Sequence, residues 1–140
     1  MEFTLYADGG SRGNPGPAGA GSVVFDNLGN RVVEVADYLG IATNNIAEYE
    51  GVLRGLTKLL AEYDAETIKN SKLTIRMDSK LVIEQLRGAY KVKHPNLVPR
   101  YLAVKNLIAR HFGPVTFEHV YRENNKDADA LANLAMDRGK

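Results

Sequence analysis

Apolar and polar residues alternate along the first part of the chain and predict β-strands. In residues 2–8 every second side chain is apolar, as in a strand with one buried face. Two further apolar runs, at residues 20–27 and 31–40, flank the turn sequence DNLGN. Three strands joined by turns predict an antiparallel meander.

The apolar residues change to a helical period from Asn44 to Tyr63, where they recur three and four positions apart. Thr43 or Asn44 can cap the start of this helix, which is the longest that the sequence predicts. The remaining elements are, in order, a strand at 71–79, helices at 79–88 and 99–110, a strand at 113–121 and a helix at 125–137.

The predicted order is therefore βββαβααβα. Because each of the last two strands follows a helix, both are expected to join the sheet as parallel crossovers. The sequence thus predicts an α/β fold in which a mixed five-stranded sheet carries helices on both faces. Its length suits a single domain over residues 1–140.

Composition narrows the function classes only a little. The chain has 140 residues and a net charge of +1, so a nucleic-acid site would have to be a local patch. Cysteine is absent, so metal ligands would be carboxylates, carbonyls or the three histidines. The sequence shows no secretory signal and no apolar run of about 20 residues, so we expect a cytoplasmic protein without membrane contact. We expect a monomer by default.

The segment LYADGGSRGNPGPAGAGSVVF, from Leu5 to Phe25, raises the question of function. Its acid, Asp8, is followed by six glycines and two prolines before apolar residues return. Glycine loses more backbone freedom on folding than any other residue, so such a segment is costly to order. The segment is either an ordinary hairpin or one wall of an active site.

Four acids have an unusual context. Asp8 and Asp78 each end a predicted strand, while Glu48 and Asp129 lie near the starts of helices. Sites in α/β sheets form beyond the carboxyl ends of strands, which would bring such acids together. Each acid alone also has an ordinary explanation, because the helix dipole favours acids in a first turn. If the four converge, they need cations between them, and oxygen ligands favour Mg²⁺ or Mn²⁺.

Four segments of the chain resemble those of type 1 ribonuclease H and occur in that family's order. They are YADGGSRGNPGPAGAG, TNNIAEYEGVLRGL, IRMDSKLVIEQLRG and NKDADALANLA. The resemblance covers nearly the whole length of the chain. It implies the ribonuclease H-like fold, whose βββαβααβα order agrees with the order predicted above.

The resemblance also implies a role for each acid. Asp8 is expected to bridge two metal ions, and Glu48 and Asp78 to bind the ion near the leaving 3′ oxygen. Asp129 is expected on the ion that holds the nucleophilic water. Asp127 lies two positions away on the same helix and therefore on another side, so we interpret it as a helix-start acid.

Substrate contacts follow from the same resemblance. The expected contacts with the RNA strand, the minor groove and a DNA phosphate are Gly9, Gly10, Ser11, Gly13, Asn14, Thr43, Asn44, Asn45, Lys80 and Asn125. In this set, Thr43 belongs to the phosphate pocket. Lys80 stands where the family often has glutamine, and a lysine there can contact the nucleic-acid backbone.

The chain departs from the family in two further places. Many members have a histidine in the loop before the last helix, but the loop YRENN has none, and Arg122 is the candidate substitute. Arginine can hold a phosphate or help product leave, but it cannot act as a general base. His119 is expected to pack or face solvent. A basic protrusion is reduced to Arg87, Lys91 and Lys93, which touch either the DNA strand or only water.

The resemblance implies an endonuclease that hydrolyses the RNA strand of RNA/DNA hybrids with two Mg²⁺ ions, for which Mn²⁺ can substitute. The products would carry 5′-phosphate and 3′-hydroxyl ends, and the role would be removal of RNA primers and hybrids in replication and repair. A hybrid-binding module without catalysis would lack at least one acid, and all four are present. An integrase or junction resolvase would not be expected to carry this glycine-rich segment. Cleavage of double-stranded RNA as well stays open.

Overall fold

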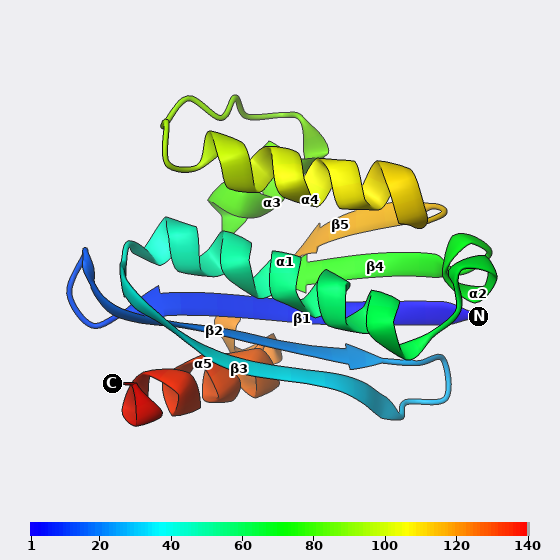
Figure 1. Cartoon of the computed structure of the whole chain (residues 1–140), viewed down its shortest axis with the longest axis horizontal. Coiled ribbons are helices and arrows are strands. Elements are labelled where there is room, and N and C mark those ends of the chain that lie inside the picture. Colours follow the sequence, from blue (N-terminus) through cyan, green and yellow to red (C-terminus); the bar gives the residue numbers. More distant parts are fainter. Residues whose placement is uncertain (140) are drawn as a thin grey trace.

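One five-stranded sheet organises the computed structural model, which describes residues 1–139 (Figure 1). The strands are β1 (Glu2–Ser11), β2 (Gly16–Phe25), β3 (Arg31–Ala42), β4 (Lys72–Met77) and β5 (Val115–His119). The helices are α1 (Asn44–Glu62), α2 (Ala65–Lys69), α3 (Lys80–Arg87), α4 (Val98–His111), the short 3-10 helix η1 (Arg122–Asn124) and α5 (Lys126–Arg138).

The topology agrees with the prediction. The strand order is β3-β2-β1-β4-β5, with β1 antiparallel to β2, β2 antiparallel to β3, and β4 parallel to both β1 and β5. The sequence analysis missed α2 and η1, because five and three residues are too few to show a helical period. It also ended the first strand at Asp8, whereas β1 continues through the glycines to Ser11.

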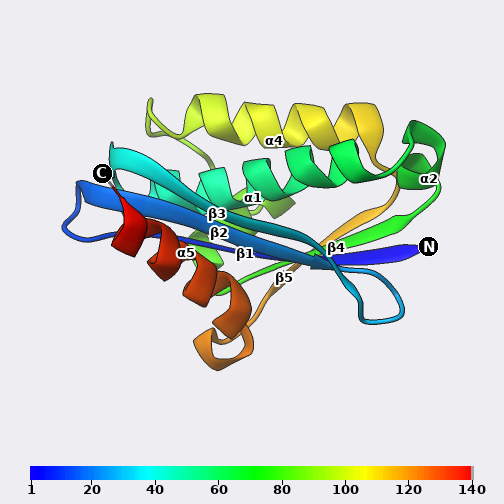
Figure 2. The same ribbon diagram turned by 60° about the horizontal axis from the view of Figure 1, so that its bottom comes forward.

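Helices cover both faces of the sheet, in two unequal layers. Figure 2 shows α1 and α4 on one face and α5 on the other. The α1 face holds the main core, in which Phe3, Leu5 and Ile75 from the strands pack with Leu56 and Leu59 of α1. Burying such apolar side chains supplies the main driving force for folding.

Glycines let both helical layers touch the strand backbone directly. A Cβ atom on Gly9 of β1 would lie 2.1 Å from the Ala47 carbonyl carbon of α1, and one on Gly51 would lie 2.5 Å from the Asp8 carbonyl oxygen. On the opposite face, a Cβ on Gly21 of β2 would lie 2.3 Å from the Ala128 carbonyl oxygen of α5. No side chain fits between these backbones, so α1 and α5 are fixed closely against β1 and β2.

Gly9 and its neighbour Gly10 offer a matched test of this contact. We expect Gly9→Ala to lower the free energy of unfolding by at least about 2 kcal/mol, because the new methyl group overlaps the α1 backbone. Gly10→Ala should change it by less than about 1 kcal/mol, since its nearest neighbour would be the Met136 side chain at 3.6 Å. Urea unfolding of both variants measures the difference, and equal stabilities would contradict the close backbone contact.

Candidate active site

The structure brings the four predicted acids and Arg122 into one cleft of about 390 Å³. We call it the acid cleft. Its lining residues come from β1 and the loop after it, α1, the residues after β4, η1 and α5: Asp8, Gly9, Gly10, Ser11, Arg12, Asn44, Glu48, Asp78, Arg122, Asp129, Ala132, Asn133 and Met136.

Strand register places Asp8 beside Asp78. The parallel pairing of β1 with β4 runs to Tyr6 opposite Arg76, and the same offset carries Asp8 opposite Asp78, just past the end of β4. Asp8 is only 8% exposed. Burial, then the charge of Asp78 and a hydrogen bond with Asp129, raise the pKa of the Asp8 carboxyl to about 8.

Glu48 enters the cleft from the second turn of α1. Thr43, one of the two caps that the sequence allowed, accepts a hydrogen bond from the Ile46 amide at the start of this helix. Burial raises the pKa of Glu48 to about 7, and the charge of Asp78 adds to the increase, while a hydrogen bond with the Ser79 side chain opposes it. Ser79 also caps α3 by accepting a hydrogen bond from the Val82 amide.

Asp129 is carried into the cleft by α5, whose start is tied to the central strand. The Asn125 side chain is 1% exposed and donates a hydrogen bond from Nδ2 to the Ala7 carbonyl oxygen, at 3.0 Å. The Asp129 amide then donates to the Asn125 carbonyl oxygen. Asp127 points elsewhere and pairs with Arg31 at 3.2 Å, in agreement with its interpretation as an acid outside the site.

The donor set suits hard divalent cations, because four carboxylates line the acid cleft and no histidine does. Within residues 1–139, no group of three or more histidine, aspartate or glutamate side chains is already arranged to hold a metal ion. The acids are instead linked in pairs, Asp8 with Asp78 and with Asp129, and Glu48 with Asp78. Such buried carboxylates ionise together only if cations neutralise them.

The predicted substrate contacts fall into three groups. Gly9, Gly10, Ser11 and Asn44 line the acid cleft. A second hollow of about 170 Å³, which we call the asparagine pocket, contains three more of them and is lined by Asn14, Thr43, Asn45, Ile46, His94, Asn96 and Leu97. The remaining three, Gly13, Lys80 and Asn125, line neither hollow.

Asn125 therefore holds α5 against β1 rather than facing the cleft. Sequence reasoning also missed several lining residues. Asn133 lies one helical turn after Asp129, so helical spacing could have indicated it. His94 and Asn96 lie in a loop without periodicity and gave no such signal.

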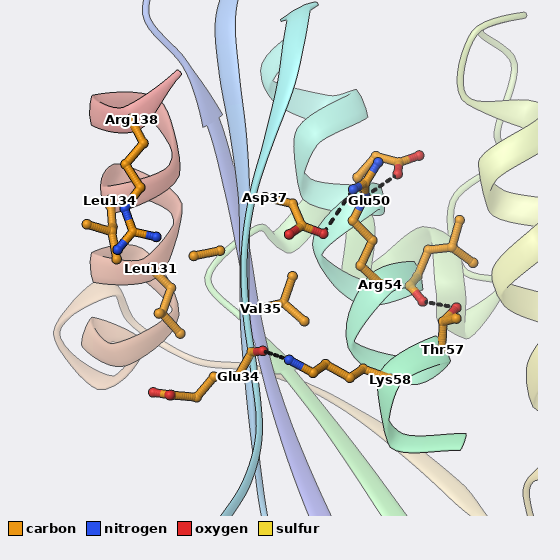
Figure 3. A pocket seen from close by; sticks show the side chains of 12 residues that line it. Glu34, Val35, Asp37, Glu50, Arg54, Thr57, Lys58, Leu131, Leu134 and Arg138 are labelled. Atoms are coloured by element: carbon orange, nitrogen blue, oxygen red, sulfur yellow. Dashed lines mark hydrogen bonds and ion pairs between the residues drawn. The ribbon is translucent and has the colours of Figure 1, made fainter. Parts of the chain in front are cut away.

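A larger hollow of about 740 Å³ lies along the edge strand β3 (Figure 3). Most of its charged groups are held in ion pairs or hydrogen bonds. Arg54 pairs with Asp37 and with Glu50, each at 2.9 Å, and the Lys58 ammonium donates to the Glu34 carbonyl oxygen at 2.7 Å. Within residues 1–139, none of the four acids of the smaller acid cleft takes part in an ion pair, and we therefore place the chemistry there.

Comparisons with known proteins agree with this architecture. The family model described as reverse transcriptase-like matches residues 6–135. The bifunctional protein Rv2228c of Mycobacterium tuberculosis is 46% identical over 138 residues, which are 98% of this chain and 36% of that protein. Ribonuclease HI of Halobacterium salinarum is 40% identical over 132 residues, 94% of this chain and 63% of that protein.

A solved structure of LC11-RNase H1 in complex with RNA/DNA hybrid superposes with a TM-score of 0.91, at 40% identity and 97% coverage of both chains. The chain belongs to the type 1 ribonuclease H family, within the reverse transcriptase-like group. It spans only about a third of the length of the Mycobacterium tuberculosis relative. Among the helices of residues 1–139, none is long and apolar enough to cross a membrane.

The raised pKa of Asp8 predicts a pH-dependent stability in the absence of metal. The folded protein keeps the Asp8 proton up to about pH 8, whereas the unfolded chain releases it near the ordinary value of 3.8. The unfolded state thus binds fewer protons, and stability falls as pH rises between about 4 and 8. We expect Asp8→Asn to raise Tm in EDTA at pH 8 by at least about 3 °C, and not at pH 4.

Scanning calorimetry with and without Mg²⁺ measures this effect. Mg²⁺ should stabilise the unsubstituted protein at pH 8 and leave Asp8→Asn nearly unchanged, because the variant lacks the central ligand. Asp127→Asn is the matched control, since this acid lies outside the cleft. A lower Tm for Asp8→Asn in EDTA at pH 8 would contradict the electrostatic strain inferred here.

Proposed function

We propose that this chain is an endonuclease that hydrolyses the RNA strand of RNA/DNA hybrids. The observation that carries the proposal is the acid cleft, in which four partly or fully buried carboxylates from separate elements lie with Arg122. The complex of LC11-RNase H1 with a hybrid supports the substrate class. The proposed products are 5′-phosphate and 3′-hydroxyl ends, and the proposed role is removal of RNA primers and hybrids in replication and repair.

Two Mg²⁺ ions, or Mn²⁺ in their place, fit the chemistry of this donor set. Asp8 would be shared between them, because it interacts with Asp78 on one side and Asp129 on the other. Glu48 would join Asp78 on the first ion. When bound, the ions would activate a water molecule and stabilise the charge on the leaving oxygen. Burial of the carboxylates strengthens their hold on such ions.

The chain's own residues would position the RNA strand over the acids. Asn44 accepts hydrogen bonds from the Ser11 amide at 2.8 Å and from the Ser11 hydroxyl at 3.2 Å, which fixes the end of β1 beside the cleft. Gly10 lines the cleft without a side chain, so a sugar would be able to approach the backbone there. The 2′-hydroxyl is the group by which such a surface would distinguish RNA from DNA.

The asparagine pocket would receive a phosphate of the DNA strand. Its hydroxyl and amide groups come from Thr43, Asn14, Asn45 and Asn96, and no acid lines it. Hydrogen bonds from such neutral groups position a backbone without reading its sequence. The acid cleft and the pocket would thus hold the two strands of one duplex. Lys80, exposed at the start of α3, would add a backbone contact.

A single pair of variants tests the catalytic assignment. We expect Asp129→Asn to lower kcat for hybrid cleavage by at least about 100-fold, because it removes a carboxylate from the cleft. Asp127→Asn, on the same helix but paired with Arg31, should stay within about threefold of the unsubstituted enzyme. Similar losses in both variants would argue against the assignment.

The substrate panel for this assay contains a labelled RNA/DNA hybrid, double-stranded RNA, single-stranded RNA and duplex DNA, each with Mg²⁺, Mn²⁺ or EDTA. Full activity in EDTA, or equal cleavage of duplex DNA, would overturn the proposal. Binding of hybrid without cleavage would instead indicate the non-catalytic alternative. Cleavage of double-stranded RNA would show a broader nuclease on the same site.

Arg122 is proposed to contact the scissile phosphate or help product leave. It lies on η1 and lines the acid cleft, and within residues 1–139 no ion pair occupies its guanidinium. We expect Arg122→Ala to reduce steady-state turnover about 10-fold or more, while the Mg²⁺ concentration for half-maximal rate stays unchanged. Arg122→Lys should recover part of the rate by keeping the charge. Unchanged turnover in Arg122→Ala would exclude the role.

A further inference from the structure

Arg12 is the first residue after β1 and one of two arginines that line the acid cleft. The other is Arg122, on η1 just before α5. Among the described residues that line this cleft, these two arginines are the only cations. Arg12 belongs neither to the predicted acids nor to the predicted substrate contacts, so its charge at the cleft has no role in the function proposed above.

An ion pair with α5 fixes the direction of the Arg12 side chain. Its Nη2 atom donates a hydrogen bond to Oδ1 of Asp137 at 2.5 Å. Asp137 lies in the last turn of α5, where the helix dipole disfavours an acid, and the Arg12 charge offsets this effect. The Arg12 amide also donates to the Pro17 carbonyl oxygen at 2.8 Å, across the hairpin that joins β1 to β2. Backbone and side chain are therefore both held at the rim of the cleft.

The ion pair leaves most of the guanidinium available for a ligand. A guanidinium has five N–H donors, and the hydrogen bond to Asp137 uses one of them. The Arg12 side chain is 50% exposed. Its planar group of donors matches the oxygens of a phosphate better than a lysine ammonium does. Arg12 thus presents oriented, unused donors and a positive charge to whatever occupies the cleft.

The position of Arg12 along α5 separates it from the acids. Asp137 lies eight residues after Asp129 on the same helix, which is about 12 Å along the helix axis. On the opposite wall, Gly10 and Ser11 line the cleft between Asp8 and Arg12 in the sequence. A nucleic-acid strand that lies over the acids and follows this wall would therefore bring a phosphate other than the scissile one to Arg12.

We propose that Arg12 binds a backbone phosphate of the cleaved RNA strand, away from the scissile bond. The inference rests on the proposed function, because it takes the RNA strand to lie over the acid cleft. Four carboxylates at the cleft repel a polyanion, and a cation at the rim offsets part of this repulsion. Arg12 is a binding residue in this assignment, and the chemical step stays with the acids.

The substitution Arg12→Ala tests this contact by its dependence on salt. We expect Kd for a labelled hybrid, measured by anisotropy in EDTA, to rise about fivefold or more, as for one lost hydrogen bond to a charged group. The slope of log Kd against log salt concentration should fall by about one, since one phosphate contact is lost. In Mg²⁺, KM should rise while kcat stays within about twofold. An unchanged Kd or an unchanged slope would overturn the inference.

The substitution Asp137→Ala separates phosphate binding from a structural role of the ion pair. It breaks the same ion pair but keeps the cation, so the salt slope should be unchanged and Kd should stay within about twofold. If Arg12 only ties the hairpin to α5, both variants will lower Tm and weaken binding equally, which would overturn the inference. Arg12→Lys should keep the slope and recover part of the affinity. Arg110→Ala, which removes an exposed arginine from a different hollow, is the matched control and should leave Kd unchanged.

Hybrids with one neutral methylphosphonate linkage identify the phosphate. The linkage is placed at a single deoxynucleotide within the RNA strand and is moved along that strand. At one position other than the scissile bond, it should weaken binding by the unsubstituted protein and cause no further loss in Arg12→Ala. Dependence on a DNA-strand linkage instead would overturn the inference. If the unsubstituted protein neither binds nor cleaves the hybrid, the proposed function fails; if only the Arg12→Ala difference is missing, this inference alone fails.

Discussion

Direct contact between helix and strand backbones on both sides of the central strands is the constraint on which the site depends. Gly51 of α1 lies against the Asp8 carbonyl oxygen, and Gly21 of β2 lies against the Ala128 carbonyl oxygen of α5. Any side chain at these places would push a helix outward. Glu48, three residues before Gly51, and Asp129, the residue after Ala128, would then move away from Asp8. The glycines therefore set the distance across which the four acids face one another.

The close approach of the four acids lowers the stability of the folded protein at the same place where it makes the carboxylates reactive. Burial and neighbouring charges raise the pKa of Asp8 to about 8 and that of Glu48 to about 7, so ionising both costs free energy that the core must offset. The core under α1 is continuous, with Phe3, Leu5 and Leu56 fully or almost fully buried. A rigid apolar layer on one side of β1 thus tolerates an electrostatically strained cleft at its end.

Sequence patterns predicted the elements whose signal is long and regular. The 19-residue helix α1 and the strand meander follow from periodicity, and the glycine-rich segment with the acid motifs indicated the residues of the cleft. The end of β1 was misplaced because Gly9 and Gly10 have no side chains to continue an alternating pattern. Asn125 was expected to contact the substrate. Its side chain instead donates a hydrogen bond to Ala7, which lies 118 residues away in the sequence. No local sequence pattern indicates a contact between residues so far apart.

The asparagine pocket is a second feature that local sequence patterns could not predict. Asn14, Thr43 and His94 come from three loops, and only the packing of α4 beside α1 brings them together. Each residue alone is an ordinary turn or cap residue: Thr43 caps α1, and the His94 ring accepts a hydrogen bond from the Asn96 amide in the turn before α4. These hydrogen bonds fix the direction of both side chains, while the Thr43 hydroxyl keeps a proton that it can donate. A helix start therefore becomes a preorganised binding surface at little additional entropic cost, since folding has already ordered the groups that would meet the ligand.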